Sequence, residues 1–560
     1  VIKARLSPLQ HLTSLKDDLR VTNVAQLQDN LLRLVASAIP NHWMRTMQPA
    51  TTAAAAAYAD RVIGEAFLTI FTDPSNPGRA ALALSTARLP IRDGGLAISN
   101  YVAIAAAAYI SSFLSTWPTC CRVCPTLRSI PVHPHPPTPT AASAFGTAYS
   151  ALSTTIRGVH ESFKMLNRQK RMWVDGTVHS GYHPHLPKKT LMLPSLDTIA
   201  RKFADPVNAP ARAASQRTFA VVPTCDAWLS CLDECLAFDA ANDSASISSV
   251  PHREAARLIS CSQHGAGAWL SRLPDPSIFG SVCHSAKYRT AIERRCGLEV
   301  SALKPALAWR EAQGEAVTLH DRLGDAAINS ANHTRRHNAG LQALYLAVSA
   351  AAVCEVKLGD KGDGTRGGRE TAAKKYSHLN ATHIPDIIAG RTLWEFKALT
   401  PFKPKPALGN GSNANGGAPS TADGWFIAFG GTLEDITRET RGLLQIGKEG
   451  DDAFDRTTGE GYVAPVDGDY ADAIRKKIPM ILFTCETSGA ISPEGHAALG
   501  HLARQVRRPG HRDGTKYGEN RGSPKGPNGF RAHHEAEISA AVVFADAETL
   551  LTYADSTTGA

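Results

Sequence analysis

The sequence predicts a multidomain α+β protein in which a helical N-terminal region precedes an α/β domain with a central mixed sheet. The chain has 560 residues, which is too many for one hydrophobic core. Apolar residues at helical spacing dominate the N-terminal part. Between residues 353 and 397, short runs with the two-residue period of strands are separated by a glycine-rich segment.

The N-terminal region, residues 1–118, is expected to be helical, with its main segments at 21–39 and 52–71. Its most apolar run covers residues 97–114. A bilayer span needs about 20 strongly apolar residues, and Asn100 and several Ser and Ala residues weaken this run. We therefore expect a buried helix and no membrane partner.

Residues 119–145 form a predicted linker rich in proline and cysteine, and residues 146–320 a mostly helical connector. Eleven cysteines in this length do not form a disulfide framework, which favours a reducing intracellular compartment. Cys121 and Cys124 have a spacing that could begin a zinc site, but the proline-rich sequence beside them favours ordinary thiols. Another cluster is expected in the core and consists of Cys225, Cys231 and Cys235.

The run 393–397 alternates between two faces of a predicted strand. Glu395 and Lys397 lie on one face, whereas the aromatic residues Trp394 and Phe396 lie on the other. The carboxylate and the ammonium group therefore emerge together, while the aromatic side chains can enter a core.

A preceding strand is predicted to end at Ile387-Ile388, and Gly390-Arg391 can form a two-residue hairpin turn. In that register Asp386 lies opposite Glu395, with Cβ atoms about 4.5–5.5 Å apart. Two carboxylates at this distance repel each other unless a cation lies between them, and oxygen ligands suit Mg²⁺ or Mn²⁺. Asp386 and Glu395 are thus candidate metal ligands, and Lys397 could orient a water or offset charge developing on a phosphodiester. The competing interpretation is an exposed hairpin with an ordinary ion pair, worth about 0–1 kcal/mol.

Upstream of the hairpin, residues 338–353 have the spacing of a helix that Asn338 can cap. Residues 353–358 are predicted to form a strand, and residues 359–368 a glycine-rich turn region. The helix carries no acidic residue, so Glu355 on the strand is the candidate for a third metal ligand, with a solvated edge residue as the alternative.

Helix, strand, turn and two further strands follow one another in the core order of the restriction-endonuclease-like PD-(D/E)xK fold. Three motifs also resemble those of the restriction-like endonuclease domain of non-LTR retrotransposons. These motifs are Arg335-Arg336-His337-Asn338, Pro385-Asp386 and Glu395-Phe396-Lys397. The resemblance implies an α/β nuclease domain over residues 321–505, with Asp386, Glu395, Lys397 and Glu355 as catalytic residues. It also suggests that Arg335, Arg336, His337 and Asn338 contact nucleic acid.

Other segments resemble, in the expected order, parts of retroelement-derived proteins of algae and other protists. They are residues 252–253, 268–274, 288–298, 429–432, 454–459, 468–471 and 486–489, and residues 89–96, which resemble the segment after a reverse-transcriptase core. The chain is therefore similar to the C-terminal part of a non-LTR retrotransposon polyprotein. A start at Val1 in place of methionine fits this expectation.

Two features of the family are missing. Members usually carry a Cys/His zinc knuckle that ends near Gly324-Asp325, but no cysteine lies between Cys296 and Cys354, so the zinc knuckle is expected to be lost. No complete reverse-transcriptase active site is present, because the two segments that resemble its Tyr-x-Asp-Asp signature lack the second aspartate. These segments are Tyr58-Ala59-Asp60 and Tyr553-Ala554-Asp555.

The C-terminal part is expected to complete the nuclease domain with a helix at 470–477 and a strand at 480–484. Residues 403–424 interrupt the domain as a loop, and its Lys403 and Lys405 could meet DNA. Residues 506–535 are basic and rich in Gly and Pro, which predicts disorder, and residues 536–560 are expected to form a terminal helix.

A net charge of +9 and a pI of about 9.0 favour a polyanionic partner. The function most consistent with the motifs is a Mg²⁺- or Mn²⁺-dependent endonuclease that nicks target DNA, with RNA of the parent element as a second partner and the nucleus as the expected compartment. The main alternative is a catalytically inactive remnant that binds nucleic acid. A third hypothesis is a standalone repair or restriction nuclease of the same fold. The sequence does not indicate an oligomeric state.

Overall fold

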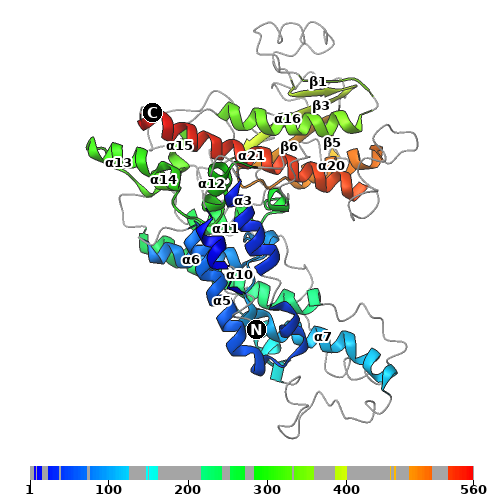
Figure 1. The fold of residues 1–560 in the computed structure, drawn as a ribbon. Helices are drawn as coiled ribbons and strands as arrows, with labels where there is room; N and C mark the ends of the chain where they lie inside the picture. The colour runs from blue at the N-terminus through cyan, green and yellow to red at the C-terminus, as the bar shows by residue number, and fades with distance from the viewer. Residues whose placement is uncertain are drawn as a thin grey trace, which may run out of the picture. The chain divides into compact units, whose positions relative to one another are not determined.

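A computed structural model describes the chain in separate ranges: 6–15 without 8, 23–36, 40–71, 76–124, 147–161 without 149 and 160, 216–242, 253–271, 283–330, 333–358 without 353, 385–399, 454–455, 460–461, 479–506 and 527–558 (Figure 1). The chain divides into two compact units. The first comprises Val1–Ala237 and Val282–Ser285, and the second comprises Phe238–Ser281 and Ala286–Ala560. The boundary between them lies inside the connector expected at 146–320.

The first unit is helical in its described part. Its elements are α2 (Leu9–Ser14), α3 (Val24–Asn30), η1 (Leu31–Val35), α4 (Asn41–Thr46), α5 (Pro49–Phe71), α6 (Pro77–Arg88), η3 (Ile91–Asp93), α7 (Tyr101–Val123) and α10 (Gln216–Asn242). The helices expected at 21–39 and 52–71 are confirmed as α3 with η1 and as α5. The buried helix expected at 97–114 is confirmed in part: α7 begins at Tyr101, buries residues such as Ala107 and Ile110, and continues to Val123, into the segment expected to be a linker. No described helix is long and apolar enough to cross a membrane.

Asp60 binds backbone groups at the start of α7 in this unit. Its Oδ1 accepts a hydrogen bond of 2.7 Å from the backbone N–H of Tyr101, and its Oδ2 accepts one of 3.0 Å from Val102. These donors belong to the first turn of α7, where backbone N–H groups lack helical partners. Burial raises the pKa of Asp60, although the two hydrogen bonds oppose the shift. Asp60 therefore fixes the start of α7.

The cysteine cluster on α10 is buried, as predicted. None of Cys225, Cys231 and Cys235 forms a disulfide bond. In the same region α7 and α10 share a small core that includes Ile110 and Phe219.

The second unit contains the mixed sheet that the sequence predicts. Its strands are β1 (Val356–Leu358), β2 (Ile387–Ala389), β3 (Thr392–Leu399), β6 (Met480–Glu486) and two short edge strands, β4 (Phe454–Asp455) and β5 (Glu460–Gly461). Their order is β1-β2-β3-β6-β5-β4. The pairs β1–β2 and β2–β3 are antiparallel, whereas β3 and β6 are parallel. The strand expected at 480–484 is confirmed as β6.

The hairpin between β2 and β3 has the predicted turn and register. Ala389 pairs with Thr392, so Gly390 and Arg391 form a two-residue loop. Gly390 has a φ of +59°, as a turn with glycine at its first central position requires.

The other described elements of this unit are helices. They are α11 (Arg253–Cys261), η6 (Ala268–Ser271), α12 (Ser285–Arg295), η7 (Ser301–Leu303), α13 (Lys304–Ala312), α14 (Leu319–Arg322), α15 (Asp325–Ser330), α16 (His333–Ala351), α20 (Pro493–Val506) and α21 (Pro527–Thr558). Two predicted boundaries are wrong. α16 begins at His333, so Asn338 lies inside the helix and does not cap it. α21 begins at Pro527, so the end of the segment expected to be disordered, 506–535, is helical, and the terminal helix predicted from 536 is longer than expected.

The core of this unit lies between the sheet and three helices, α16, α20 and α21 (Figure 1). Trp394 and Phe396 of β3 belong to it, as the alternation of the strand predicts. α16 approaches the sheet closely at Gly340, because a Cβ atom there would lie 2.3 Å from Cζ of Phe396. The opposite face of β3 therefore carries Glu395 and Lys397.

Buried ion pairs connect several helices of the unit. Arg253 Nε lies 2.6 Å from Asp325 Oδ2, and Arg336 Nη1 lies 3.2 Å from Asp546 Oδ1. Burial opposes the charge of Asp325, but Arg253 and other hydrogen-bond partners outweigh it and lower the pKa of Asp325 to about 2. The Gly324-Asp325 segment thus supplies the carboxylate partner of a buried arginine.

Candidate functional site

The β2–β3 hairpin organises the candidate site. The register pairs Ile387 with Trp394, and extending it by one residue places Asp386 across from Glu395. Asp386 lies in the bend immediately before β2, and both residues are buried, with 8% and 1% of their surfaces exposed. One acidic residue therefore lies just before β2 and the other lies on β3.

Backbone and helix groups orient the Asp386 carboxylate. Its Oδ2 accepts a hydrogen bond of 2.7 Å from the backbone N–H of Phe396 and lies 3.3 Å from Nε2 of His337. The same Nε2 lies 3.1 Å from the carbonyl oxygen of Phe396. Burial lowers the pKa of His337, but the hydrogen bond and charge of Asp386 outweigh burial and raise it. Helix α16 thus places a basic ring against the first acid of the site.

Glu395 and Lys397 contact each other on one face of β3. Lys397 Nζ lies 2.5 Å from Glu395 Oε1, and the lysine side chain is 23% exposed while the glutamate side chain is 2% exposed. The ammonium group therefore neutralises the buried carboxylate and still reaches solvent.

Glu355 is not brought to this pair. It precedes β1, whose Val356 pairs with Ala389 beside the hairpin turn, whereas Asp386 lies at the other end of β2. Four residues of strand correspond to about 13 Å. The Glu355 side chain is 74% exposed and lies 2.8 Å from Lys357 Nζ. Its geometry is that of a solvated ion pair at the edge of the sheet, and its role as a metal ligand stays a prediction.

The residues predicted to contact nucleic acid have different environments. Arg335 is exposed and donates to Thr552 Oγ1 at 3.0 Å, and Asn338 is also exposed. Arg336 is buried and paired with Asp546, so its guanidinium group stabilises the packing of α16 on α21. His337 contacts Asp386, as described above.

Several predicted features lie outside the described residues. They are Lys403 and Lys405, the loop 403–424, the helix at 470–477, the turn region at 359–368 and most of the segment 506–535.

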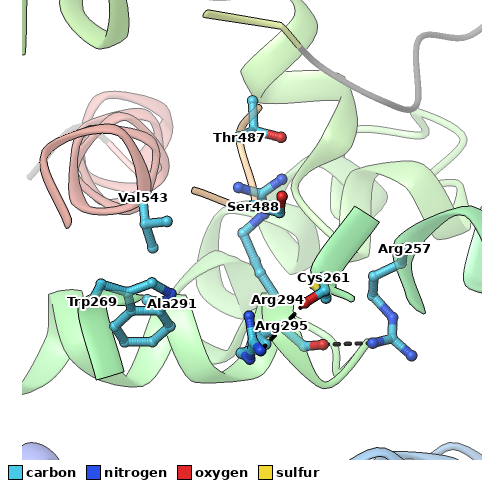
Figure 2. A pocket seen from close by; sticks show the side chains of 9 residues that line it. All are labelled: Arg257, Cys261, Trp269, Ala291, Arg294, Arg295, Thr487, Ser488 and Val543. Carbon is cyan, nitrogen blue, oxygen red and sulfur yellow. Dashed lines mark hydrogen bonds between the residues drawn. The ribbon is translucent and has the colours of Figure 1, made fainter. Parts of the chain in front are cut away.

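Figure 2 shows a small cavity in the second unit, lined by arginine side chains from α11 and α12. Its lining residues are Arg257, Cys261, Trp269, Ala291, Arg294, Arg295, Thr487, Ser488 and Val543. The arginine side chains bind protein groups: Arg257 donates to the Arg295 carbonyl oxygen, and Arg295 donates to the Cys261 carbonyl oxygen at 3.5 Å. The cavity measures about 30 Å³, enough for one or two water molecules, so it is not a substrate pocket.

Sequence patterns miss one cluster of possible metal ligands in the same unit. His264, His496 and Glu535 bring ligand atoms within 4.8 Å of one another, and among the described residues no other group of three or more His, Cys, Asp or Glu does so. The three residues lie in a loop, in α20 and in α21, so no local spacing motif could have identified them.

Comparison of the chain with protein-family models, with curated proteins and with solved structures finds no match.

Proposed function

We propose that the chain is a metal-dependent DNA endonuclease that hydrolyses a phosphodiester bond and nicks target DNA. The observation that carries the proposal is the β2–β3 hairpin, in which Asp386, just before β2, accepts a hydrogen bond from the N–H of Phe396, the residue after Glu395, while Lys397 contacts Glu395. An acid at the start of one strand and an acid and a lysine on the next strand are the groups that such a reaction requires.

The order of elements around the pair supports this proposal. α16 is followed by the antiparallel strands β1, β2 and β3, and β6 then pairs in parallel with β3. This is the order of the restriction-endonuclease-like fold to which the motifs are similar. An origin in a non-LTR retroelement, a nuclear location and binding of element RNA stay proposals drawn from that similarity.

The donor groups fit Mg²⁺ or Mn²⁺, because Asp386 and Glu395 offer carboxylate oxygens. A bound ion of this kind polarises a phosphate oxygen and lowers the pKa of its water. The chain itself supplies the orientation of the acids. The Phe396 N–H and the His337 ring hold Asp386, and Lys397 provides a positive charge near the pair that can stabilise charge developing on the phosphate.

A positively charged chain and exposed basic residues favour DNA as the partner. The net charge is +9, and Arg335 is exposed on the same helix as His337. Lys403 and Lys405 stay candidates for further phosphate contacts.

A second candidate function is binding of nucleic acid without cleavage. It is favoured by the engagement of both acids with protein groups, Asp386 with Phe396 and His337 and Glu395 with Lys397. The described residues also bring no third acid to the pair.

A plasmid-nicking assay with the full chain separates the two functions. Conversion of supercoiled to open-circular DNA is measured in Mg²⁺, in Mn²⁺ and in EDTA for the wild type, Asp386→Asn and Glu395→Gln. We expect metal-dependent nicking by the wild type and a loss of about 100-fold or more in both variants. Glu548→Gln is the matched control, since Glu548 is an exposed acid that pairs with Lys287.

Nicking by Asp386→Asn at the wild-type rate contradicts the proposed site. Salt-dependent DNA binding with no nicking by the wild type in either metal supports the second function. Glu355→Gln tests the third ligand expected from the sequence, because the register predicts that this variant retains activity.

A further inference from the structure

His264, His496 and Glu535 meet at one point in the second unit, although 232 residues separate the two histidines and 39 separate His496 from Glu535. His264 lies in the loop between α11 and η6, His496 in the first turn of α20, and Glu535 in α21. Nδ1 of His264 lies 2.6 Å from Nε2 of His496, and Nδ1 of His496 lies 2.7 Å from Oε1 of Glu535.

The contact with Glu535 fixes the tautomer of His496. A carboxylate accepts a hydrogen bond from Nδ1–H, which leaves Nε2 with a lone pair directed at His264. This is the carboxylate–histidine arrangement that orients metal ligands in proteins.

The backbone around the cluster is held in place independently of any ligand. The carbonyl oxygen of His264 accepts from Ile491 N–H at 3.3 Å, and that of Gly265 accepts from Ser539 Oγ at 3.3 Å. Gly265 has a φ of +82°, and a Cβ atom there would lie 3.3 Å from Cε1 of His496. The loop is therefore fixed against α21 and against Ile491, just before α20, in a conformation that favours glycine, which presents the His264 ring to His496.

We propose that His264 Nδ1 and His496 Nε2 bind a divalent transition metal, of which Zn²⁺ is the best match, while Glu535 holds the His496 ring through its Nδ1–H. Imidazole nitrogens are zinc ligands, whereas Mg²⁺ prefers oxygen ligands alone. This site is therefore chemically distinct from the Asp386–Glu395 pair and does not depend on the function proposed for that pair.

The nitrogen atoms need only a small adjustment to bind the metal. Zinc–nitrogen bonds of about 2.0–2.1 Å in a tetrahedral site put two ligand nitrogens about 3.3 Å apart. The His264 and His496 nitrogens lie 2.6 Å apart, and the exposed His264 ring can move outward while the buried His496 stays against Glu535. Arg531 Nε lies 2.6 Å from Glu535 Oε1, so its charge moderates the affinity.

Metal binding would join three segments of the second unit. The loop after α11 and the start of α20 would share one ion, and Glu535 in the N-terminal part of α21 would be joined to it through His496. Binding stabilises the folded state because the unfolded chain holds no such site.

The test uses the full chain after treatment with EDTA and dialysis. Zn²⁺ is titrated by calorimetry, thermal unfolding is followed with and without Zn²⁺, and the visible absorption of bound Co²⁺ identifies the ligand type. We expect one Zn²⁺ per chain, a higher unfolding temperature with Zn²⁺, and a Co²⁺ spectrum without the charge-transfer band of thiolate ligands. Glu535→Gln should weaken binding about 10- to 100-fold.

Two histidine variants and a matched control make the result specific. His264→Ala and His496→Ala should lose the bound Zn²⁺ and the thermal shift, while His501→Ala should retain both. His501 lies on α20 near His496 and contacts Gln505. Because His264 is exposed, His264→Ala should unfold in EDTA at the same temperature as the wild type, which separates loss of the site from loss of the fold. Absence of stoichiometric Zn²⁺ binding by the wild type, or unchanged binding by His264→Ala and His496→Ala, overturns the proposal.

Discussion

Replacing Gly340 by alanine tests how closely α16 packs on the sheet that carries Asp386 and Glu395. A Cβ atom at this position would lie 2.3 Å from Cζ and 2.6 Å from Cε1 of Phe396. Carbon atoms in contact are normally about 3.5–4.0 Å apart, so the ring would have to move by more than about 1 Å. Phe396 is fully buried and stacks on Phe483 with ring centroids 6.0 Å apart, which leaves it little room.

Two effects of opposite sign determine how Gly340→Ala changes the free energy of unfolding. Overpacking a core costs about 1–3 kcal/mol, whereas alanine in a helix interior gains about 0.8–1.0 kcal/mol over glycine. We expect a net destabilisation of about 0–2 kcal/mol, in contrast to the stabilisation of an alanine that meets no neighbour. The displacement would also reach the candidate site, because the backbone N–H of Phe396 binds Asp386.

Gly500→Ala is the matched control. Gly500 lies inside α20, and a Cβ atom there would meet nothing within 4 Å. This variant should be stabilised by about 0.5–1 kcal/mol. Hydrogen exchange of peptides from α16 and β3 in increasing urea gives the opening free energy of this region. Equal stabilisation by Gly340→Ala and Gly500→Ala would refute the close packing of α16 on Phe396.

Two further predictions concern buried charges in the second unit. Asp546→Ala removes the carboxylate that pairs with the buried Arg336 and with its neighbour Arg294. The free energy of unfolding of the unit, measured by urea titration, should fall by about 3–5 kcal/mol. A decrease below about 1 kcal/mol would contradict these ion pairs. Burial raises the pKa of Glu486 to about 7 against the hydrogen bonds that it accepts, so the folded state binds its proton more tightly than the unfolded state does. Stability should therefore fall as the pH rises from about 4.5 through 7, by up to about 3 kcal/mol from this group. Glu486→Gln should flatten that slope between pH 5 and 8, and an unchanged slope would exclude Glu486 as a source.

The hairpin could be predicted from the sequence because its signals are local. The alternation from 393 to 397 assigns the faces of β3, and Gly390 marks the turn, so the register follows. The contact between His337 and Asp386 could not be predicted in this way, since 49 residues separate the two and the helix must first pack on the sheet.

The sequence does not predict where α16 and α21 begin, for a related reason. Residues 333–337 are all polar and show no apolar period, and long-range contacts such as that of Arg336 with Asp546 hold this turn of α16. The start of α21 has the Gly, Pro and basic residues of a disordered segment, yet Phe530 and His534 are buried there. Tertiary burial, which a single sequence does not display, decides both cases.

The central claim is that Asp386, Glu395 and Lys397 act together on a phosphodiester bond. Its most direct test is the rate of Mg²⁺-dependent plasmid nicking by Lys397→Ala relative to the wild type, with Lys287→Ala as a control that removes a lysine paired with Glu548 elsewhere in the unit. We predict that the wild type and Lys287→Ala nick at similar rates and that Lys397→Ala is slower by about 100-fold or more. Nicking by Lys397→Ala at the wild-type rate would contradict the account.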